Sequence, residues 1–278
     1  MNWAFPQVPT ERVVILRRLV YAVVLLDIFL LTAFPIGHGN IPADLYSQLP
    51  VRAILHLPQP TAVYVQVLRI VIAVAAVLAL LGVRPRITGW VVAFGMLDWL
   101  SNAYSYGKIN HDHLALLVAL FVLPLAAAKA TDAREALQRN GWSMRMIQVS
   151  VVATYFLAAI AKVSEAGWGW ASSAVLVWAI TRRGSALGQL VAHWPLLTYV
   201  FQWVVLILEF CAPLMLWLRG RPLYAYVAFW FVFHASTFAL LGIHFIPTAV
   251  CLFAFLPLER LAGRRVISRA VRPRAAWR

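Results

Sequence analysis

Several ionisable side chains lie inside or at the ends of long apolar runs in this 278-residue sequence. They are Asp27, Arg69, Asp98, His111, His113, Lys162, Glu209, His234 and His244. A charged group is costly in a hydrocarbon environment, so such residues either pair with one another or take part in function. Each is therefore a candidate for a direct chemical role or for a bond that fixes helix packing.

Lys162 is the leading candidate for a chemical role. Gln148, Tyr155 and Lys162 recur every seven residues and therefore share one face of a helix. Alanines at 158, 159 and 161 lie beside that line, so a neighbouring helix or a flat ligand can approach closely. An amine that loses its hydration beside an apolar cavity favours its neutral form and can act as a base. The alternative is that Lys162, near the outer end of its helix, extends its ammonium group to lipid head groups.

The segment Asn110-His111-Asp112-His113 opens another apolar run. Asn110 is a suitable residue to cap the helix that follows. Two histidines at positions i and i+2 point to different faces of a helix, so we expect no metal shared between them. We expect instead one histidine facing a cavity and the other hydrogen-bonded at a helix interface.

Three further candidates lie in other apolar runs. Glu209 is in the middle of the run 196–218 and requires a partner or a proton there. His234 and His244 flank the connection between the last two runs. Asp98 and Asn102 are four residues apart on one helical face, where they could pair with each other or with a basic group.

Composition indicates the kind of scaffold that holds these residues. Hydrophobic residues make up 63% of the chain and charged residues 12%, with a mean hydropathy of +0.79. Soluble domains are about 45–50% apolar and about 25% charged, so the composition excludes an ordinary water-soluble protein and a disordered chain. The two cysteines, Cys211 and Cys251, both lie in apolar runs and offer no disulfide framework.

The apolar runs predict an all-α transmembrane helix bundle. A membrane-spanning helix needs about 20 apolar residues, and eight candidate spans meet this description. They are residues 17–36, 62–83, 87–104, 111–128, 146–164, 196–218, 222–241 and 244–258. The segment between the fifth and sixth spans holds an apolar stretch too short to cross, which predicts a re-entrant or interfacial helix near 172–190.

The basic residues predict the orientation. The formal net charge is +14, and most of the 24 basic residues fall on one side of the eight predicted spans, including the 84–86 and 219–221 turns. The positive-inside rule then places both termini in the cytoplasm of a multi-pass protein of the cell membrane. We expect a transmembrane domain over 1–260 and a basic cytoplasmic tail over 261–278. No aromatic and basic reading surface is present, so nucleic acid is excluded as a partner.

Four stretches resemble the membrane domain of the vitamin K-dependent gamma-glutamyl carboxylases and of their bacterial relatives, the horizontally transferred transmembrane (HTTM) family. The first is Tyr155-Phe156-Leu157-Ala158-Ala159-Ile160-Ala161-Lys162-Val163, followed by Trp168. The others are Asn110-His111, Leu208-Glu209-Phe210, and Phe233-His234 followed by Ile243 and Pro247. They occur in the family's order and at similar spacing over most of residues 90–258.

The resemblance implies a specific chemistry. In the carboxylases a lysine of this motif deprotonates reduced vitamin K, oxygen adds to the resulting anion, and an epoxide forms. The matching lysine here is Lys162, and the histidine matching His111 belongs to the same region. The catalytic candidates are thus Lys162 and His111. The substrate-binding candidates are Tyr155, Trp168, His234, Glu209, His113, Asp98 and Asn110. The implied co-substrates are O2 and a reduced quinone of the vitamin K or menaquinol type, with no covalent cofactor.

The chain also departs from that pattern. The family motif often has two successive lysines, and the first of these positions is Ala161 here. The carboxylases carry a large non-membrane domain after their helices, whereas this chain ends shortly after its last predicted span, which argues against protein carboxylation.

Three functions remain open from the sequence. The first is a membrane oxygenase or epoxidase acting on a lipid-soluble quinol, which requires a cavity holding Lys162 and His111 together. The second is a non-catalytic accessory to a peptide or redox partner, with Lys162 extended to lipid or paired with Glu165 or Glu209 and no cavity beside it. The third is a transporter, for which no inverted repeat is evident.

Overall fold

The computed structural model describes residues 3–106, 111–126 and 132–262, and these form an all-α protein without a β-strand. The expected all-α class is confirmed. The longer helices are α1 (Thr10–Leu26), α4 (Ala62–Leu81), α5 (Pro85–Tyr104), α6 (Leu114–Ala126), α7 (Ala133–Ala166), α10 (Pro195–Cys211) and α11 (Gly220–Leu241). The shorter ones are α2 (Pro35–His38), α3 (Pro50–Ile54), α8 (Val175–Arg183), α9 (Ala186–Ala192) and α12 (Ile246–Leu252). The expected basic tail lies outside the described residues from 263 onward.

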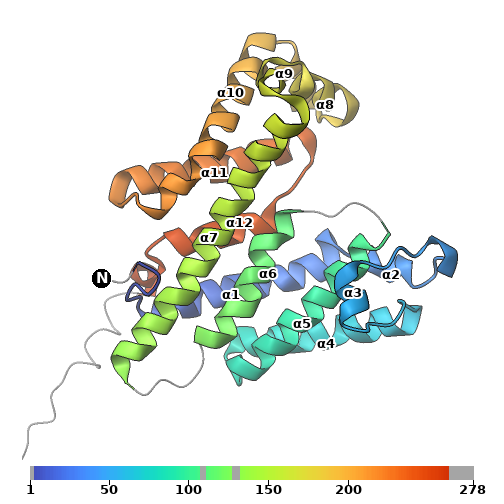
Figure 1. Cartoon of the computed structure of the whole chain (residues 1–278), viewed down its shortest axis with the longest axis vertical. Helices are drawn as coiled ribbons and strands as arrows, with labels where there is room; N and C mark the ends of the chain where they lie inside the picture. The colour runs from blue at the N-terminus through green and yellow to red at the C-terminus, as the bar shows by residue number, and fades with distance from the viewer. Residues whose placement is uncertain (1–2, 107–110, 127–131, 263–278) are drawn as a thin grey trace, which may run out of the picture.

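The long helix α7 connects two groups of helices (Figure 1). At one end, α4 packs between α1 and α5, and α6 contacts α1, α5 and α7. At the other end, α8, α9, α10 and α11 gather around the second half of α7. Helix α12 passes between the two groups and contacts α1, α6, α7 and α11. The chain segments with the candidate residues therefore converge around α7.

Four helices in the described part of the chain are long and apolar enough to cross a membrane. They are Ala62–Leu81, Ala133–Ala166, Pro195–Leu216 and Gly220–Leu241. On the first of these, large apolar side chains such as Val63, Ile70 and Val74 are exposed, as expected for a face that contacts lipid. The protein is therefore a multi-pass membrane protein.

These four helices are fewer than the eight predicted spans. Helix α5 has the required length, but Asp98, Ser101 and Asn102 reduce its hydropathy. Helix α6 is described for 13 residues. Helix α12 has only 7 residues, because the backbone after Leu252 tightens into a 3-10 turn. Helix α1 ends after 17 residues in a π-helical turn at Asp27–Leu31. Continuous apolar sequence was thus not equivalent to continuous helix.

Helix α7 is longer than the span 146–164 predicted from hydropathy. It begins at Ala133, in the segment that connects the predicted spans 111–128 and 146–164. The Asp132 carboxylate caps it by accepting a 2.7 Å hydrogen bond from the Glu135 backbone N–H, and Glu135 pairs with Arg139 one turn later. Its 34 residues correspond to roughly 50 Å, more than the hydrocarbon core of about 30 Å.

The segment after α7 forms two short helices instead of one helix near 172–190. A 3-10 turn, η4 (Trp168–Ser172), leads into α8, and the chain then breaks at Gly184 before α9. The Ser185 hydroxyl caps α9 by accepting a hydrogen bond from the Gly188 N–H at 3.1 Å. Gly188 packs so closely on α11 that a Cβ atom there would lie 2.4 Å from the Leu240 carbonyl oxygen. This close contact holds α9 against α11, the helix that carries His234.

Candidate functional site

A cavity of about 640 Å³ lies between the second half of α7 and the helices around it. Its walls come from α7, α8, α10, α11, the segment 243–248 and the 3-10 turn η3 (His111–His113). The lining is mostly apolar and includes the aromatic side chains of Trp170, Phe201, Phe233 and Phe245. The volume is within the range of about 300–1,000 Å³ that is typical of small-molecule sites.

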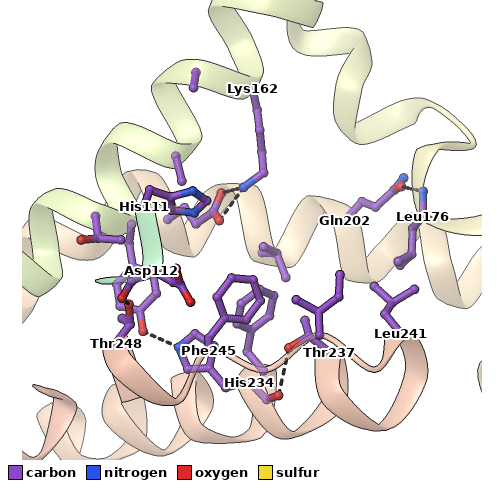
Figure 2. Close-up of a pocket in the computed structure, with 18 of the residues that line it drawn as sticks. His111, Asp112, Lys162, Leu176, Gln202, His234, Thr237, Leu241, Phe245 and Thr248 are labelled. Carbon is purple, nitrogen blue, oxygen red and sulfur yellow. Dashed lines mark hydrogen bonds and ion pairs between the residues drawn. The ribbon is translucent and has the colours of Figure 1, made fainter. Parts of the chain in front are cut away.

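Lys162 and Glu209 form an ion pair in this cavity. Lys162 Nζ donates to Glu209 Oε1 at 2.5 Å and also to Oε2. The Glu209 side chain is only 5% exposed and the Lys162 side chain 23%, so the carboxylate is the more buried partner. The ammonium group also lies 5.1 Å from the centre of the Trp170 ring, within the range of a cation–π contact. Figure 2 shows Lys162 extending from α7 toward the cavity, with His111 close by.

Tyr155 and His234 form a second polar pair in the same cavity. The Tyr155 hydroxyl and His234 Nε2 are 2.7 Å apart, with donor and acceptor set by the histidine tautomer. The Tyr155 ring stacks on Trp230 with centroids 3.8 Å apart, which fixes its position. Within the described part of the chain, His234 Nδ1 is buried and has no hydrogen-bond partner. That nitrogen is a polar group from the protein that a ligand could satisfy.

The two histidines of the HDH segment have different surroundings, as their spacing predicts. His111 is exposed and lines the cavity, together with Asp112. His113 is buried outside it, with Nδ1 2.9 Å from an Asp112 oxygen and Nε2 3.0 Å from Asp27 Oδ1. Thr32 donates to that same Asp27 oxygen at 2.9 Å, so the π-helical turn after α1 is tied to η3.

Other predicted site residues lie away from the cavity. Asp98 of α5 is bonded to Arg52 of α3 and to the Tyr64 hydroxyl of α4, so it neither lines the cavity nor pairs with Asn102. Trp168 is 61% exposed and stacks on Phe210, whereas its neighbour Trp170 lines the cavity. Asn110 lies outside the described residues.

Gln202 is a cavity residue that the sequence analysis missed. Its amide oxygen accepts from the Leu176 N–H at 2.8 Å, and its amide nitrogen donates to Ser173 O at 2.8 Å. Gln202 therefore holds the start of α8 onto α10 at the cavity wall (Figure 2). Gln202 could have been identified from the sequence, because it is the single amide side chain in the apolar run 196–218. The sequence analysis considered only ionisable residues in that run.

The chemistry of the site is that of a largely apolar chamber with two polar pairs. Among the described residues, no group of His, Cys, Asp and Glu side chains is arranged to hold a metal ion. The side chains present can accept or donate protons and hydrogen bonds through Lys162, Glu209, Tyr155, His234 and His111.

Comparison with known proteins identifies the family. No curated protein and no solved structure matches the chain. The model of the HTTM domain matches residues 9–259, which include every helix from α1 to α12. The chain is therefore a member of the HTTM domain family.

Proposed function

We propose that this protein is an integral membrane enzyme that binds a reduced quinone-like, lipid-soluble molecule in the cavity and oxygenates it with O2 to an epoxide. The observation that carries this proposal is the Lys162–Glu209 pair in a cavity of about 640 Å³ with mostly apolar walls. A lysine and a carboxylate in contact with a ligand-sized apolar space are suited to proton transfer with an apolar substrate.

The residues that line the cavity suit a flat aromatic head group. Aromatic side chains at 170, 201, 233 and 245 offer faces and edges for ring contacts. Lys162 and Tyr155 are two turns apart on α7, or about 10 Å along its axis. A substituted ring between them would have a polar pair near each of its two oxygens. The alanines at 158 and 161 keep that wall of the cavity open.

The two charges of the Lys162–Glu209 pair cancel, so the pair is compatible with apolar surroundings. When the ammonium proton moves to the carboxylate, Lys162 becomes a neutral amine that can take the proton of a quinol hydroxyl. The resulting oxyanion would give up electrons to O2. Overall, one quinol and one O2 yield one quinone epoxide and one water, so the two electrons and two protons of the quinol are accounted for. His111 and His234 are the proposed stabilising groups for the anion.

A second candidate function is a non-catalytic accessory to a peptide or redox partner. The contact of Lys162 with Glu209 is the contact that this alternative expects. The accessory function predicts no cavity beside that contact, but a ligand-sized cavity is present there. For this reason we favour the enzyme. No observation favours a transporter.

We also propose the orientation and the remaining spans. The basic turns at 84–86 and 219–221 would lie in the cytoplasm, and the cavity would lie in the outer half of the membrane. Helices α1, α5 and α6 would add spans beside the four helices that meet the length and hydropathy requirements, whereas α12, with 7 residues, would cross only part of the membrane.

The test is a quinol assay on the purified full-length protein in lipid nanodiscs. Reduced vitamin K or menaquinol is supplied with oxygen, and the epoxide is quantified by mass spectrometry, with an anaerobic sample as the control for O2. Lys162→Ala is measured beside Arg69→Ala, which removes a cation that lies outside the cavity and bonds to Gln66. Epoxide from the parent and Arg69→Ala but not from Lys162→Ala supports the proposal. A folded parent that binds the quinol without forming epoxide refutes the enzyme and supports the accessory function.

A further inference from the structure

A second cavity, of about 470 Å³, is lined by Met144, Arg145 and Gln148 from the first half of α7. Arg145 lines it, and the rise of an α-helix separates Arg145 from Lys162 by roughly 25 Å. That distance approaches the thickness of the hydrocarbon core, so with α7 crossing the membrane the two cavities would lie toward opposite faces of the bilayer. The proposed quinol chemistry at Lys162 and the content of this second cavity are independent of each other.

The charges that line this cavity have one sign. Arg12, Arg145 and Arg219 contribute to its wall, and its lining includes no aspartate or glutamate. Arg12 is neutralised from outside the cavity, because Glu259 accepts from its Nε and from its Nη2, each at 2.7 Å. The net positive charge of the cavity therefore comes from Arg145 and Arg219.

Arg145 is buried without a charged partner. It is only 5% exposed, and within the described residues no carboxylate lies within ion-pair distance of it. Its Nε atom is buried and has no hydrogen-bond partner in the part of the chain that the structure describes. The guanidinium lies 4.7 Å from the centre of the Trp3 ring, which covers one of its faces and leaves its edge available. A buried guanidinium with an unsatisfied donor is costly unless an anion compensates it.

Arg219 brings a second guanidinium to the same place. Arg145 Nη1 and Arg219 Nη1 both point to the carbonyl oxygen of Leu216, at 3.4 and 3.5 Å. Arg219 Nη1 also points to the carbonyl oxygen of Leu218 at 3.3 Å. These long bonds leave most of the ten N–H donors of the two side chains for another acceptor. Arg219 is close enough to repel Arg145, so an anion between them would remove an unfavourable interaction.

The N-terminus of α11 adds backbone donors to the cavity. Gly220 and Leu223, in the first turn of this 22-residue helix, both line the cavity. No side chain caps that turn, and a Cβ atom on Gly220 would meet nothing within 4 Å, so the space above its backbone is open. An uncapped helix N-terminus attracts anions through its free N–H groups and its dipole.

We propose that this cavity binds a phosphate group, held by Arg145, Arg219 and the first turn of α11. Phosphate matches the site because its oxygens accept several charge-assisted hydrogen bonds at once from guanidinium and backbone donors. Two sources share this chemistry, namely the head group of an anionic phospholipid and a free phosphate or phosphorylated small molecule. The place of the cavity near one membrane face favours the lipid, and the experiment distinguishes the two.

The test is native mass spectrometry of the full-length protein in detergent micelles. Phosphatidylglycerol and phosphatidylcholine are titrated separately, and inorganic phosphate is then added as a competitor. The variants are Arg219→Gln and Arg145→Gln. The matched control is Arg86→Gln, an exposed arginine that does not line the cavity. Because Arg219 is exposed, Arg219→Gln tests the site even where Arg145→Gln fails to fold.

The expected result is that the parent and Arg86→Gln bind phosphatidylglycerol with equal affinity, and that Arg219→Gln binds it about tenfold more weakly. Binding of lipid that resists competition by phosphate assigns the site to a lipid head group. Displacement of the lipid by phosphate assigns it to a free phosphate or a phosphorylated small molecule. Equal binding of phosphatidylglycerol by the parent and Arg219→Gln, or an equal loss in Arg86→Gln, would overturn the proposal.

Discussion

Lys162 and Glu209, 47 residues apart in sequence, meet in the cavity with Lys162 Nζ 2.5 Å from Glu209 Oε1. The contact joins α7 to α10 and places one acid and one base at the edge of an apolar chamber. The carboxylate is the more buried member of the pair and the lysine the more exposed one, and both line the cavity.

The first prediction concerns Glu209. Replacing Glu209 with Gln keeps the shape of the side chain but removes the proton acceptor next to Lys162. Lys162 then remains protonated, and epoxide formation should fall by about 100-fold or more, the range of a lost general acid–base partner. The rate of epoxide formation in nanodiscs is the measurement. A rate within a factor of about two of the parent would show that Glu209 only holds α10 against α7.

The second prediction concerns Tyr155. Tyr155→Phe preserves the stacking on Trp230 but leaves His234 Nε2 buried without its 2.7 Å partner. An unsatisfied buried group costs about 1–3 kcal/mol, so thermal unfolding should occur at a lower temperature. As a matched control, Tyr199→Phe removes an exposed hydroxyl on α10 and should leave the melting temperature unchanged. Equal melting temperatures for the parent and Tyr155→Phe would contradict the role of this pair.

The third prediction concerns the space beside Lys162. Ala158→Leu places a larger side chain on the cavity wall without replacing an ionisable group. The substrate should bind more weakly, with KM raised several-fold, because the added side chain occupies ligand volume. Ala225→Leu, at an exposed position on α11, is the control with the same change of size. An unchanged KM in Ala158→Leu would place the substrate elsewhere.

The fourth prediction concerns pH. The hydrogen bond from Arg12 lowers the pKa of Glu259, which lies after the last helix, below its ordinary value. The ionised carboxylate therefore stabilises the folded state above the unfolded pKa of about 4.3, and this contribution is lost as the pH falls through the lower folded pKa. The melting temperature of Arg12→Gln should lie below that of the parent at neutral pH. The two should converge under acidic conditions, and a difference that stays constant with pH would contradict the linkage.

The fifth prediction concerns His113. This side chain is buried between Asp27 and Asp112 and does not line the cavity. His113→Ala leaves two buried carboxylates without their shared partner and should destabilise the protein by about 3–5 kcal/mol. His111→Ala, two residues earlier and exposed, should lower epoxide formation with a much smaller effect on stability. The reverse pattern would exchange the roles assigned to the two histidines.

The sequence predicted some of these relationships because helical periodicity survives tertiary packing. The heptad that joins Tyr155 to Lys162 does share a face, and both residues line the cavity. The spacing of His111 and His113 likewise separated their environments. These predictions depended on local geometry, which an α-helix sets by itself.

Other relationships depended on contacts between distant segments. Asp98 is bonded to Arg52, which lies on a short helix that hydropathy did not predict. The apolar sequence around Asp98 therefore could not show that this carboxylate lies away from the cavity. Trp170, and not the predicted Trp168, lines the cavity because a 3-10 turn changes the direction of the chain after Gly167. The span count failed for a similar reason, because polar residues in α5 and the π-helical turn after α1 interrupt apolar runs in ways that average hydropathy does not register.

The central claim, that Lys162 is the base for a quinol substrate, is tested most directly by epoxide formation from reduced vitamin K or menaquinol in the parent and in Lys162→Arg. Arginine retains the positive charge and the pairing with Glu209 but cannot lose its proton. The account predicts epoxide from the parent and none above background from Lys162→Arg, with both proteins equally folded. Epoxide formation by Lys162→Arg at the rate of the parent would contradict it.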